Sequence, residues 1–378
     1  MELSNSGANI QQGMAIYRKP GATMPDFCVG PWHTTPAPSG AGVVTFCLQP
    51  FSRTAPLSWL GRELVGQGWQ HAERIWHSQF PQLPTKALPT ATTRGEFVEE
   101  VLGIQRAIEQ QRLQKAVAAR ISTVEKTLSP DSIWTSFMAL HTAYPAAFVF
   151  LIIHPTWGCW MGATPETLIR VDETQATIMS LAGTLTQNQL EWTHKEALEQ
   201  SVTSVFIQEV LARSGISGAK ESAVGELVMG DVRHLMSEWQ FNLPTSQHAF
   251  SNHEGANEPS AIERVVNAKD SNRHTPSAEK PLMNLIRLLH PTPAVGGYPQ
   301  AEALDWLAQN EVVDRQLYTG FVGLMGDMEA DFYVTLRCAR LFQTGYALYA
   351  GCGVNAGSDP DIEWEETAAK MNLLGRFL

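Results

Sequence analysis

The sequence predicts an α+β fold. Strand-like apolar runs come in clusters, such as 147–153, 159–162, 167–171 and 176–181, and helical stretches interrupt the clusters without a regular strand–helix alternation. Regular alternation is typical of a doubly wound parallel sheet, so its absence favours separate groups of strands and helices. The 378 residues, 44% of them hydrophobic, are enough to bury a large core as one or two domains.

The first part of the chain predicts little regular structure. Residues 1–40 are rich in Gly, Pro, Ser and Thr, and we expect an irregular N-terminal lead-in there. Residues 42–48 predict the first strand, and residues 96–114 carry apolar side chains at helical spacing. We therefore expect one domain over 41–378.

Later elements follow from the same patterns. They are a strand at 115–124, a helix at 132–142 that begins at a Ser-Pro-Asp-Ser sequence, a long helix at 189–214, and strands at 319–326, 330–341 and 347–353. The last three strands are typical of an antiparallel meander. Residues 245–280 are polar and lack apolar periodicity, so we expect a mobile insertion there.

Composition excludes several classes of protein. The formal net charge of -11 argues against a general nucleic-acid partner. The 5 cysteines form no CxxC pair and no zinc spacing, so we expect small buried side chains in a reducing compartment. We find no signal peptide and no apolar run of membrane length. These features predict a cytoplasmic protein without a membrane partner.

A glycine-rich turn near the C-terminus leads into a helix with three charged residues on one face. The turn is Gly351-Cys-Gly-Val-Asn-Ala-Gly357, and Glu363, Glu366 and Lys370 follow at spacings of three and four. Two carboxylates and an ammonium beside a glycine turn suit a hard cation and an anionic ligand. Arg337 adds a cation from a strand-like segment. The pattern predicts a site for a magnesium-bound carboxylate.

The same glycine run superficially resembles a dinucleotide fingerprint. That fingerprint needs an opening strand–helix–strand unit and an acidic residue about twenty positions later on a second strand. No such strand follows residue 357. We therefore favour a turn whose backbone N–H groups meet a carboxylate.

Further candidates rest on weaker patterns. Glu196 and Glu199 lie at a spacing of three on the long helix and suit a second metal carboxylate, although spacing alone favours a solvated helix face. Glu166 follows a proline at a turn, and Lys115 opens an apolar strand. A turn carboxylate and a lysine reaching solvent would explain these two residues without catalysis.

Taken together, the motifs resemble the chorismate-utilising enzymes, most closely the isochorismate synthases. The resemblance covers residues 113–378 and implies two stacked, mainly antiparallel β-sheets with helices outside. Its markers are Leu113-Gln-Lys-Ala-Val-Ala-Ala-Arg120, Gly162-Ala-Thr-Pro-Glu166, Leu181-Ala-Gly-Thr184, His290-Pro-Thr-Pro-Ala-Val-Gly-Gly297, Asp314-Arg-Gln-Leu-Tyr-Thr-Gly320, the Thr-Leu-Arg-Cys-Ala strand around Arg337, and Glu363-Trp-Glu-Glu-Thr-Ala-Ala-Lys370.

Three positions discriminate within the family. Lys115 stands where members that use water carry lysine, whereas the aminating branch typically has glutamine, so no glutamine amidotransferase subunit is implied. Ala182 stands where aminodeoxychorismate synthases have a nucleophilic lysine. The motif at 290–297 looks like that of isochorismate synthases rather than salicylate synthases. The resemblance implies a monomeric isomerase that serves menaquinone or siderophore biosynthesis.

The resemblance also implies roles for individual residues. Lys115 resembles the general base that activates water for attack at C2 of chorismate, and Glu166 the general acid that protonates the departing C4 hydroxyl. Glu199 and Glu366 match the family's magnesium (Mg²⁺) ligands, and Glu363 lies close by. The implied substrate-binding residues are Gly183, Thr184, His234, Ala294, Arg337, Gly353 and Lys370.

Two alternatives stay open at this stage. A salicylate synthase would make isochorismate and then eliminate pyruvate in the same site. A non-catalytic descendant would bind chorismate or a partner. Four residues whose joint presence argues against it are Lys115, Glu166, Glu199 and Glu366. One departure from the family pattern is Gln200, where relatives usually carry histidine.

Overall fold

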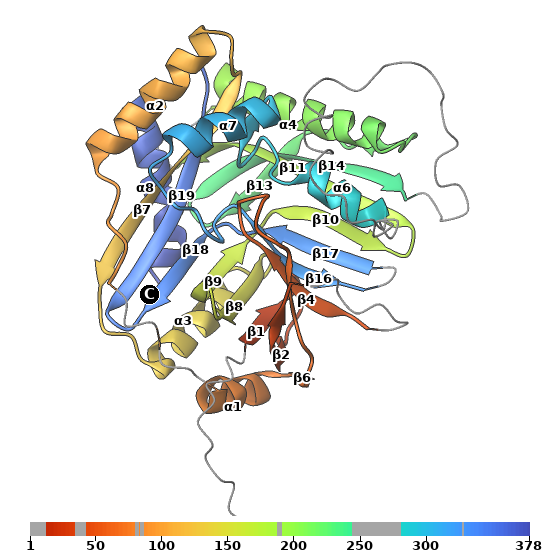
Figure 1. The fold of residues 1–378 in the computed structure, drawn as a ribbon, viewed down its shortest axis with the longest axis vertical. Helices are drawn as coiled ribbons and strands as arrows, with labels where there is room; N and C mark the ends of the chain where they lie inside the picture. The colour runs from red at the N-terminus through yellow and green to blue at the C-terminus, as the bar shows by residue number, and fades with distance from the viewer. Residues whose placement is uncertain are drawn as a thin grey trace, which may run out of the picture.

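Two large β-sheets with helices on their outer faces make up the computed structural model (Figure 1). All the strand pairings among the described residues are antiparallel. The predicted α+β architecture with two stacked antiparallel sheets is therefore confirmed. The structure describes residues 13–34, 43–79, 83, 87–186, 191–243, 281–326 and 329–378.

The nine-stranded sheet has the order β15-β7-β19-β18-β9-β8-β1-β2-β6. Its strands are β1 (Gly13–Arg18), β2 (Asp26–Gly30), β6 (Leu64–Gln67), β7 (Lys115–Glu125), β8 (Phe148–His154), β9 (Gly158–Thr164), β15 (Gly297–Tyr298), β18 (Cys338–Phe342) and β19 (Gly345–Val354).

The ten-stranded sheet has the order β12-β14-β11-β10-β17-β16-β4-β5-β3, and β13 pairs with β14. Its strands are β3 (Trp32–His33), β4 (Thr45–Gln49), β5 (Ser58–Leu60), β10 (Thr167–Asp172), β11 (Gln175–Thr186), β12 (Lys220–Glu221), β13 (Gly225–Met229), β14 (Val232–Asn242), β16 (Phe321–Met325) and β17 (Glu329–Val334).

Strand β8 is covered on both faces, which explains why its run of apolar residues is unbroken. Phe148 and Phe150 pack into the core between the sheets, where Phe148 stacks on Tyr333 of the other sheet at 4.3 Å between ring centres. Val149 and Leu151 point the opposite way, into the core beneath the helices. Because successive side chains alternate, a strand covered on both faces needs an apolar residue at every position.

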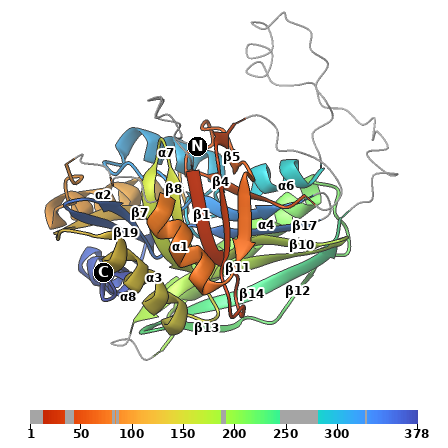
Figure 2. The same ribbon diagram turned by 90° about the horizontal axis from the view of Figure 1, so that it is seen from below.

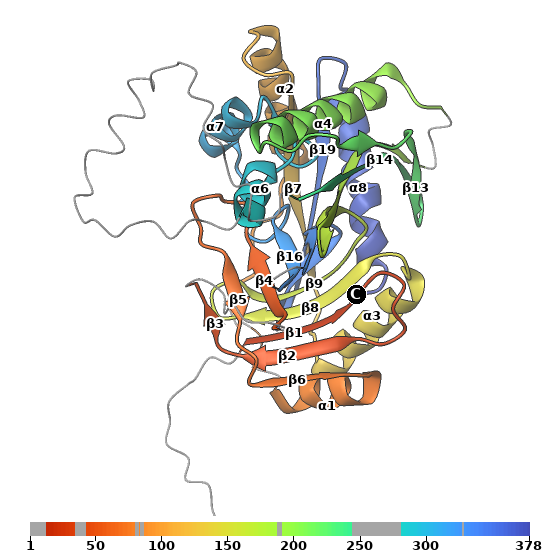
Figure 3. The same cartoon turned by 90° about the vertical axis from the view of Figure 1, so that its right-hand side faces the viewer.

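Helices cover the outer faces of the two sheets (Figures 2 and 3). Helices α1, α3 and α8 pack on the nine-stranded sheet, α2 lies against β7 and α8, and α4 lies against β11 and β14. None of the helices in the described ranges is long and apolar enough to cross a membrane. The helices are α1 (Trp69–Gln79), α2 (Arg94–Glu109), α3 (Pro130–Ala143), α4 (His194–Arg213), α6 (Pro281–Leu289), α7 (Gln300–Asn310) and α8 (Pro360–Gly375).

The two helices that carry the predicted metal ligands have strong start signals. Helix α4 begins at a capping box, in which Thr193 and Glu196 each satisfy a backbone N–H of the other. Helix α8 begins after Asp359, whose side chain accepts hydrogen bonds from two backbone N–H groups, and Pro360 occupies the first turn. These caps fix the rotation of both helices and hence the direction of their carboxylates.

The predicted irregular lead-in over 1–40 is wrong for the residues that the structure describes. Strands β1 and β2 pair with each other, and β1 also pairs with β8 inside the nine-stranded sheet. Every residue of Gly13–Arg18 is buried. The Gly, Pro and Ser residues around this short apolar run predict irregular structure and made the strand hard to recognise. Because β1 and β2 pair within the nine-stranded sheet, the domain includes strands well before residue 41. The predicted insertion at 245–280 lies outside the described residues.

The predicted strand at 330–341 is two strands in different sheets. Strand β17 pairs with β16 in the ten-stranded sheet, whereas β18 pairs with β19 in the nine-stranded sheet. The chain crosses between the sheets at Arg337, whose φ of 47° is rare for a residue other than glycine. The expected three-strand meander is therefore wrong, and the crossing brings Arg337 to the junction of the two sheets.

Candidate active site

A buried cavity of about 50 Å³ collects most of the predicted site residues. A water molecule needs about 10–15 Å³ of such space, so the cavity holds only a few waters. A substrate with a six-membered ring therefore requires side chains around the cavity to move. The predicted residues that line the cavity are Glu166, Gly183, Thr184, Glu199, His234, Ala294, Arg337, Gly353 and Lys370.

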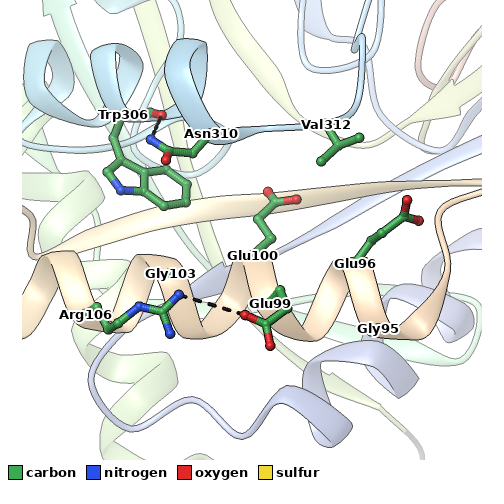
Figure 4. A pocket seen from close by; sticks show the side chains of 9 residues that line it. All are labelled: Gly95, Glu96, Glu99, Glu100, Gly103, Arg106, Trp306, Asn310 and Val312. Atoms are coloured by element: carbon green, nitrogen blue, oxygen red, sulfur yellow. Dashed lines mark hydrogen bonds and ion pairs between the residues drawn. The ribbon is translucent and has the colours of Figure 1, made fainter.

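A larger hollow of about 400 Å³ lies between α2 and α7 (Figure 4). It is lined by Glu96, Glu99, Glu100 and Trp306, among others, and by none of the predicted site residues. The predicted base, acid and metal ligands all lie at or beside the smaller cavity. We therefore take the smaller cavity as the candidate active site.

Lys115 begins β7 and is only 2% exposed. Its Nζ lies 3.4 Å from Oε2 of Glu199. Burial lowers the pKa of Lys115, while the Glu199 carboxylate opposes this shift. Gly353 on the neighbouring strand makes room for the pair, because a Cβ atom there would lie 2.7 Å from Cε of Lys115 and would overlap the Glu199 carboxylate.

Glu166 lies at the turn between β9 and β10 and is 2% exposed. Burial raises the pKa of its carboxyl group to about 8, although Arg337 and Lys115 act in the opposite direction. A carboxyl group with this pKa is protonated at neutral pH and can act as an acid. Lys115 and Glu166 therefore have the shifts that a base and an acid require.

Arg337 is held by a neutral histidine. Its Nη2 donates to Nε2 of His234 at 2.7 Å, so Nε2 must be unprotonated and Nδ1 carries the proton. Nδ1 lies 3.1 Å from the carbonyl oxygen of Gly183 and 3.1 Å from Oγ1 of Thr184. Burial, and then the Arg337 cation, lower the pKa of His234 well below its ordinary value, which keeps the ring neutral.

The Arg337 side chain keeps donor capacity for a ligand. Its Nε has no hydrogen-bond partner among the described residues, and the residue is buried. A buried guanidinium with a donor to spare suits a carboxylate.

Gly183 allows helix α4 to approach the sheet. The register of β11 and β14 shifts between Ala182 and Thr184, and Gly183 has a φ of +75°. A Cβ atom at this position would lie 3.0 Å from the backbone oxygen of Glu196. The left-handed conformation and the close approach together require glycine.

Four buried carboxylates from α4 and α8 surround the ammonium group of Lys195, which the sequence analysis did not assign to the site. The Nζ atom lies 2.8 Å from Glu363 Oε1 and 3.4 Å from Glu199 Oε1. It lies 3.9 Å from Glu366 Oε2 and 4.0 Å from Glu196 Oε1. We call Glu196, Glu199, Glu363 and Glu366 the carboxylate cluster.

Other partners distinguish the members of the carboxylate cluster. Glu196 is engaged by its capping box, and Glu366 pairs with Nζ of Lys370 at 2.6 Å. Neither oxygen of Glu363 has a hydrogen-bond partner in the described chain, so its contact with Lys195 is an ion pair without hydrogen-bond geometry. Burial, and then Glu366, raise the pKa of Glu363 to about 7. Burial also acts to raise the pKa of Glu366, but Lys370 and Lys195 outweigh it and lower that pKa.

The donor chemistry of the carboxylate cluster fits magnesium. Magnesium takes oxygen ligands, typically one or two carboxylates together with water and substrate oxygens. Glu199, Glu363 and Glu366 could hold the ion. The observation that favours such a ligand is that neither oxygen of the buried Glu363 accepts a hydrogen bond in the described chain, although Oε1 is ion-paired with Lys195. Within the described ranges, however, no three His, Cys, Asp or Glu side chains already form a metal-binding group.

The structure gathers all the predicted residues in one region. Lys115 reaches the cavity wall through Glu199, while Glu366 reaches it through Lys370. The sequence analysis missed Lys195, although its spacing of four from Glu199 was a usable signal. It also did not name the cavity-lining residues Val117 and Tyr318, although both lie in motifs that carry the family resemblance.

Comparisons with known proteins agree with this geometry. The profile of the chorismate binding enzyme family matches residues 61–252 and 273–378. A salicylate biosynthesis isochorismate synthase of Pseudomonas aeruginosa is 28% identical over 332 residues, which is 84% of this chain and 63% of that protein. This chain therefore spans less than two thirds of that relative. Isochorismate synthase EntC of Escherichia coli K12 is 26% identical over 331 residues, 86% of this chain and 77% of that protein.

A solved structure shares the fold. The menaquinone-specific isochorismate synthase of Escherichia coli superposes with a TM-score of 0.73 at 19% identity, over 97% of this chain and 88% of that one. The family profile covers well over half of the sequence and includes the residues that build the cavity. The chain belongs to the chorismate binding enzyme family.

Proposed function

We propose that the protein is an isochorismate synthase, an isomerase that converts chorismate to isochorismate. The observation that carries the proposal is a buried glutamate that lines the cavity and a buried lysine that is paired with the cavity-lining Glu199. Their opposite pKa shifts suit an acid and a base. The two sequence relatives and the solved structure described above bear the name isochorismate synthase, which supports the same reaction.

In this reaction Lys115 takes a proton from water, and the water oxygen attacks C2 of the ring. The two ring double bonds each shift by one position, and the C4 hydroxyl departs as water with the proton of Glu166. One water enters and one leaves, so the atoms balance. Lys115 ends protonated and Glu166 ionised, and proton exchange with solvent resets both. A positioned acid or base typically contributes about 10²–10⁴ in rate.

The cationic residues support substrate binding in the proposal. Arg337, steadied by His234, has an unpartnered N–H that suits one substrate carboxylate. Lys370 presents its ammonium between Glu366 and the carbonyl oxygen of Gly351, next to the same cavity. Glu199, Glu363 and Glu366 would hold the magnesium ion, which when bound supplies charge that orients and neutralises a substrate carboxylate.

The proposal is tested by incubating the purified protein with chorismate, with magnesium or with a chelator, and separating the products by chromatography. Isochorismate formed only with magnesium is the expected result. Salicylate and pyruvate would instead identify a salicylate synthase. Unchanged chorismate in the presence of magnesium would contradict the proposal and favour a binding protein.

Matched variants link the reaction to the assigned residues. Glu166→Gln preserves the shape of the side chain and removes the acid, and Lys115→Gln replaces the base with an uncharged amide. Each should lower kcat by about 10²-fold or more. Turnover at the wild-type rate in either variant would contradict that residue's role. Whether the product serves menaquinone or siderophore biosynthesis is a separate question, which genomic neighbours address.

A further inference from the structure

Lys195 occupies the point on which the proposed magnesium ligands converge. Its Nζ is within 4.0 Å of an oxygen of each of Glu363, Glu199 and Glu366. We propose that Lys195 is the internal cation of the metal-free enzyme and that divalent metal binding is an exchange, in which the Lys195 ammonium leaves the carboxylate cluster as the metal enters. Magnesium as the entering ion rests on the function proposed above.

The distances make joint occupancy unfavourable. Magnesium binds carboxylate oxygens at about 2.0–2.1 Å, whereas the Nζ atom of Lys195 already lies 2.8 Å from Glu363. A metal drawn to the same oxygens would meet the ammonium at close range, and two cations at that separation repel strongly in a buried site. The carboxylates are instead arranged around the ammonium, with oxygens 2.8 to 4.0 Å from its Nζ atom.

The metal-free protein needs a cation at this point. Glu363 is 0% exposed, and Lys195 is its ion-pair partner in the described structure. Glu199 and Glu366 each have a second lysine, Lys115 and Lys370 respectively. Without Lys195, Glu363 would be a buried carboxylate with no counter-ion, which destabilises a protein strongly.

Lys195 is also placed to leave. Its side chain is 15% exposed, whereas that of Lys115 is 3% exposed. The backbone of Lys195 is fixed separately, because its N–H donates to Oγ1 of Thr193 and its carbonyl oxygen accepts from Asn355. A lysine has a flexible four-carbon stem, so the ammonium can turn to solvent while helix α4 stays in place. Lys370, by contrast, is anchored to the carbonyl oxygen of Gly351.

Replacing Lys195 with methionine should therefore lower the stability of the metal-free protein and raise its affinity for magnesium. The variant retains an unbranched apolar stem and removes the competing cation. If the lysine vacates the cluster about 1–10% of the time, its removal tightens the apparent dissociation constant for magnesium about 10- to 100-fold. The metal-free variant should melt at a lower temperature than the wild type, and magnesium should raise its Tm by more than it raises that of the wild type.

Calorimetric titration with magnesium chloride alone, without chorismate, measures the exchange separately from catalysis. Arg18→Met is the matched control, because Arg18 is a buried cation in β1 that donates to the carbonyl oxygens of Tyr144 and Pro145, away from the carboxylate cluster. It should lower Tm equally with and without magnesium and leave the magnesium affinity unchanged. An unchanged or weaker magnesium affinity in Lys195→Met would overturn the exchange.

A second measurement uses the wild-type protein and does not depend on folding of a variant. Modification of lysines by an amine-reactive reagent, followed by mass spectrometry, should be several-fold faster at Lys195 with magnesium than without it. Exposed Lys220 serves as the internal reference and should not change. Equal protection of Lys195 in both conditions would also overturn the exchange. If magnesium binds and speeds modification of Lys195 but the protein does not convert chorismate, the proposed function is contradicted while the exchange stands.

Discussion

The guanidinium of Arg337 donates to Nε2 of His234 at 2.7 Å, so a neutral ring rather than a carboxylate holds this buried cation. The choice of partner matters because a carboxylate would neutralise the charge that the proposed substrate needs. The proton on Nδ1 is directed to the carbonyl oxygen of Gly183, which fixes both the tautomer and the orientation of the ring. His234 is therefore a positioning residue for Arg337.

Replacing His234 with alanine should weaken substrate binding more than it slows the chemical step. Loss of the acceptor leaves Arg337 without its fixed orientation, so we expect KM for chorismate to rise about tenfold or more while kcat changes less. Steady-state kinetics across a chorismate series measures both constants. His234→Gln, which keeps an acceptor, should recover part of the loss. A change confined to kcat would be inconsistent with a positioning role.

The acid role of Glu166 predicts a limb in the pH profile. Because the pKa of Glu166 in the free protein is raised to about 8, the carboxyl group loses its proton as the pH passes that value. The ratio kcat/KM reports ionisations of the free enzyme, so it should fall above about pH 8. Measurements from pH 6 to 9.5 with saturating magnesium would show this limb. Glu166→Gln should have low activity and lack it.

The same group predicts how stability depends on pH. The pKa of Glu166 rises from 4.5 in a free glutamate to about 8 in the folded protein, so the native state holds the proton more tightly than the unfolded state. The stabilisation is fully present below about pH 4.5 and is lost as the pH rises through about 8. The difference is on the order of a few kcal/mol in the free energy of unfolding.

Urea unfolding of the wild type and of Glu166→Gln at several pH values isolates this contribution. Glutamine is neutral throughout, so the wild type should lose stability relative to the variant as the pH rises from 5 to 8. All other ionisable groups are common to both proteins and cancel in the comparison. Parallel curves would mean that Glu166 is not protonated in the folded state.

The sequence motifs singled out residues that are far apart along the chain, and the fold places most of them at one cavity. Glu166, Arg337 and Lys370 come from a turn, a crossing between sheets and a helix, and the fold brings them to one cavity. The crossing itself could not be predicted, since residues 330–341 are apolar enough to continue as one strand. Only tertiary pairing shows that the chain changes sheets there.

The sequence analysis also failed to predict strand β1 and the buried position of Lys195, because both depend on contacts with distant parts of the chain. Strand β1 was hidden because local Gly, Pro and Ser content predicts irregular structure, whereas its burial depends on pairing with the distant strand β8. Lys195 was overlooked because a lysine in the first turn of a helix is usually solvated. Its charge is drawn inward by carboxylates from α8, far along the chain.

Gln200 shows how a departure from the family pattern can be structural. Its Nε2 donates to the carbonyl oxygen of Ser180 and to the hydroxyl oxygens of Ser180 and Ser237, so it faces the sheet and not the carboxylate cluster. Gln200→Ala should lower the free energy of unfolding by about 1–3 kcal/mol and leave the magnesium affinity unchanged. Chemical unfolding and magnesium titration of the same variant test both parts. A weakened magnesium affinity would tie Gln200 to the metal site.

Gly353 provides the sharpest test of the geometry between Lys115 and Glu199. A methyl group at residue 353 would overlap the Glu199 carboxylate and lie 2.7 Å from Cε of Lys115, so Gly353→Ala must separate the pair. Because small misplacements of catalytic groups reduce rates steeply, we expect turnover to fall by about 10²-fold and magnesium binding to weaken. Gly357→Ala, in the turn that follows β19, is the control, since its nearest neighbour, Oδ1 of Asn355, would be 3.6 Å away. Activity near the wild-type level in Gly357→Ala and a large loss in Gly353→Ala would locate the effect at the Lys115–Glu199 pair. Equal losses would point to general disruption of the chain between β19 and α8.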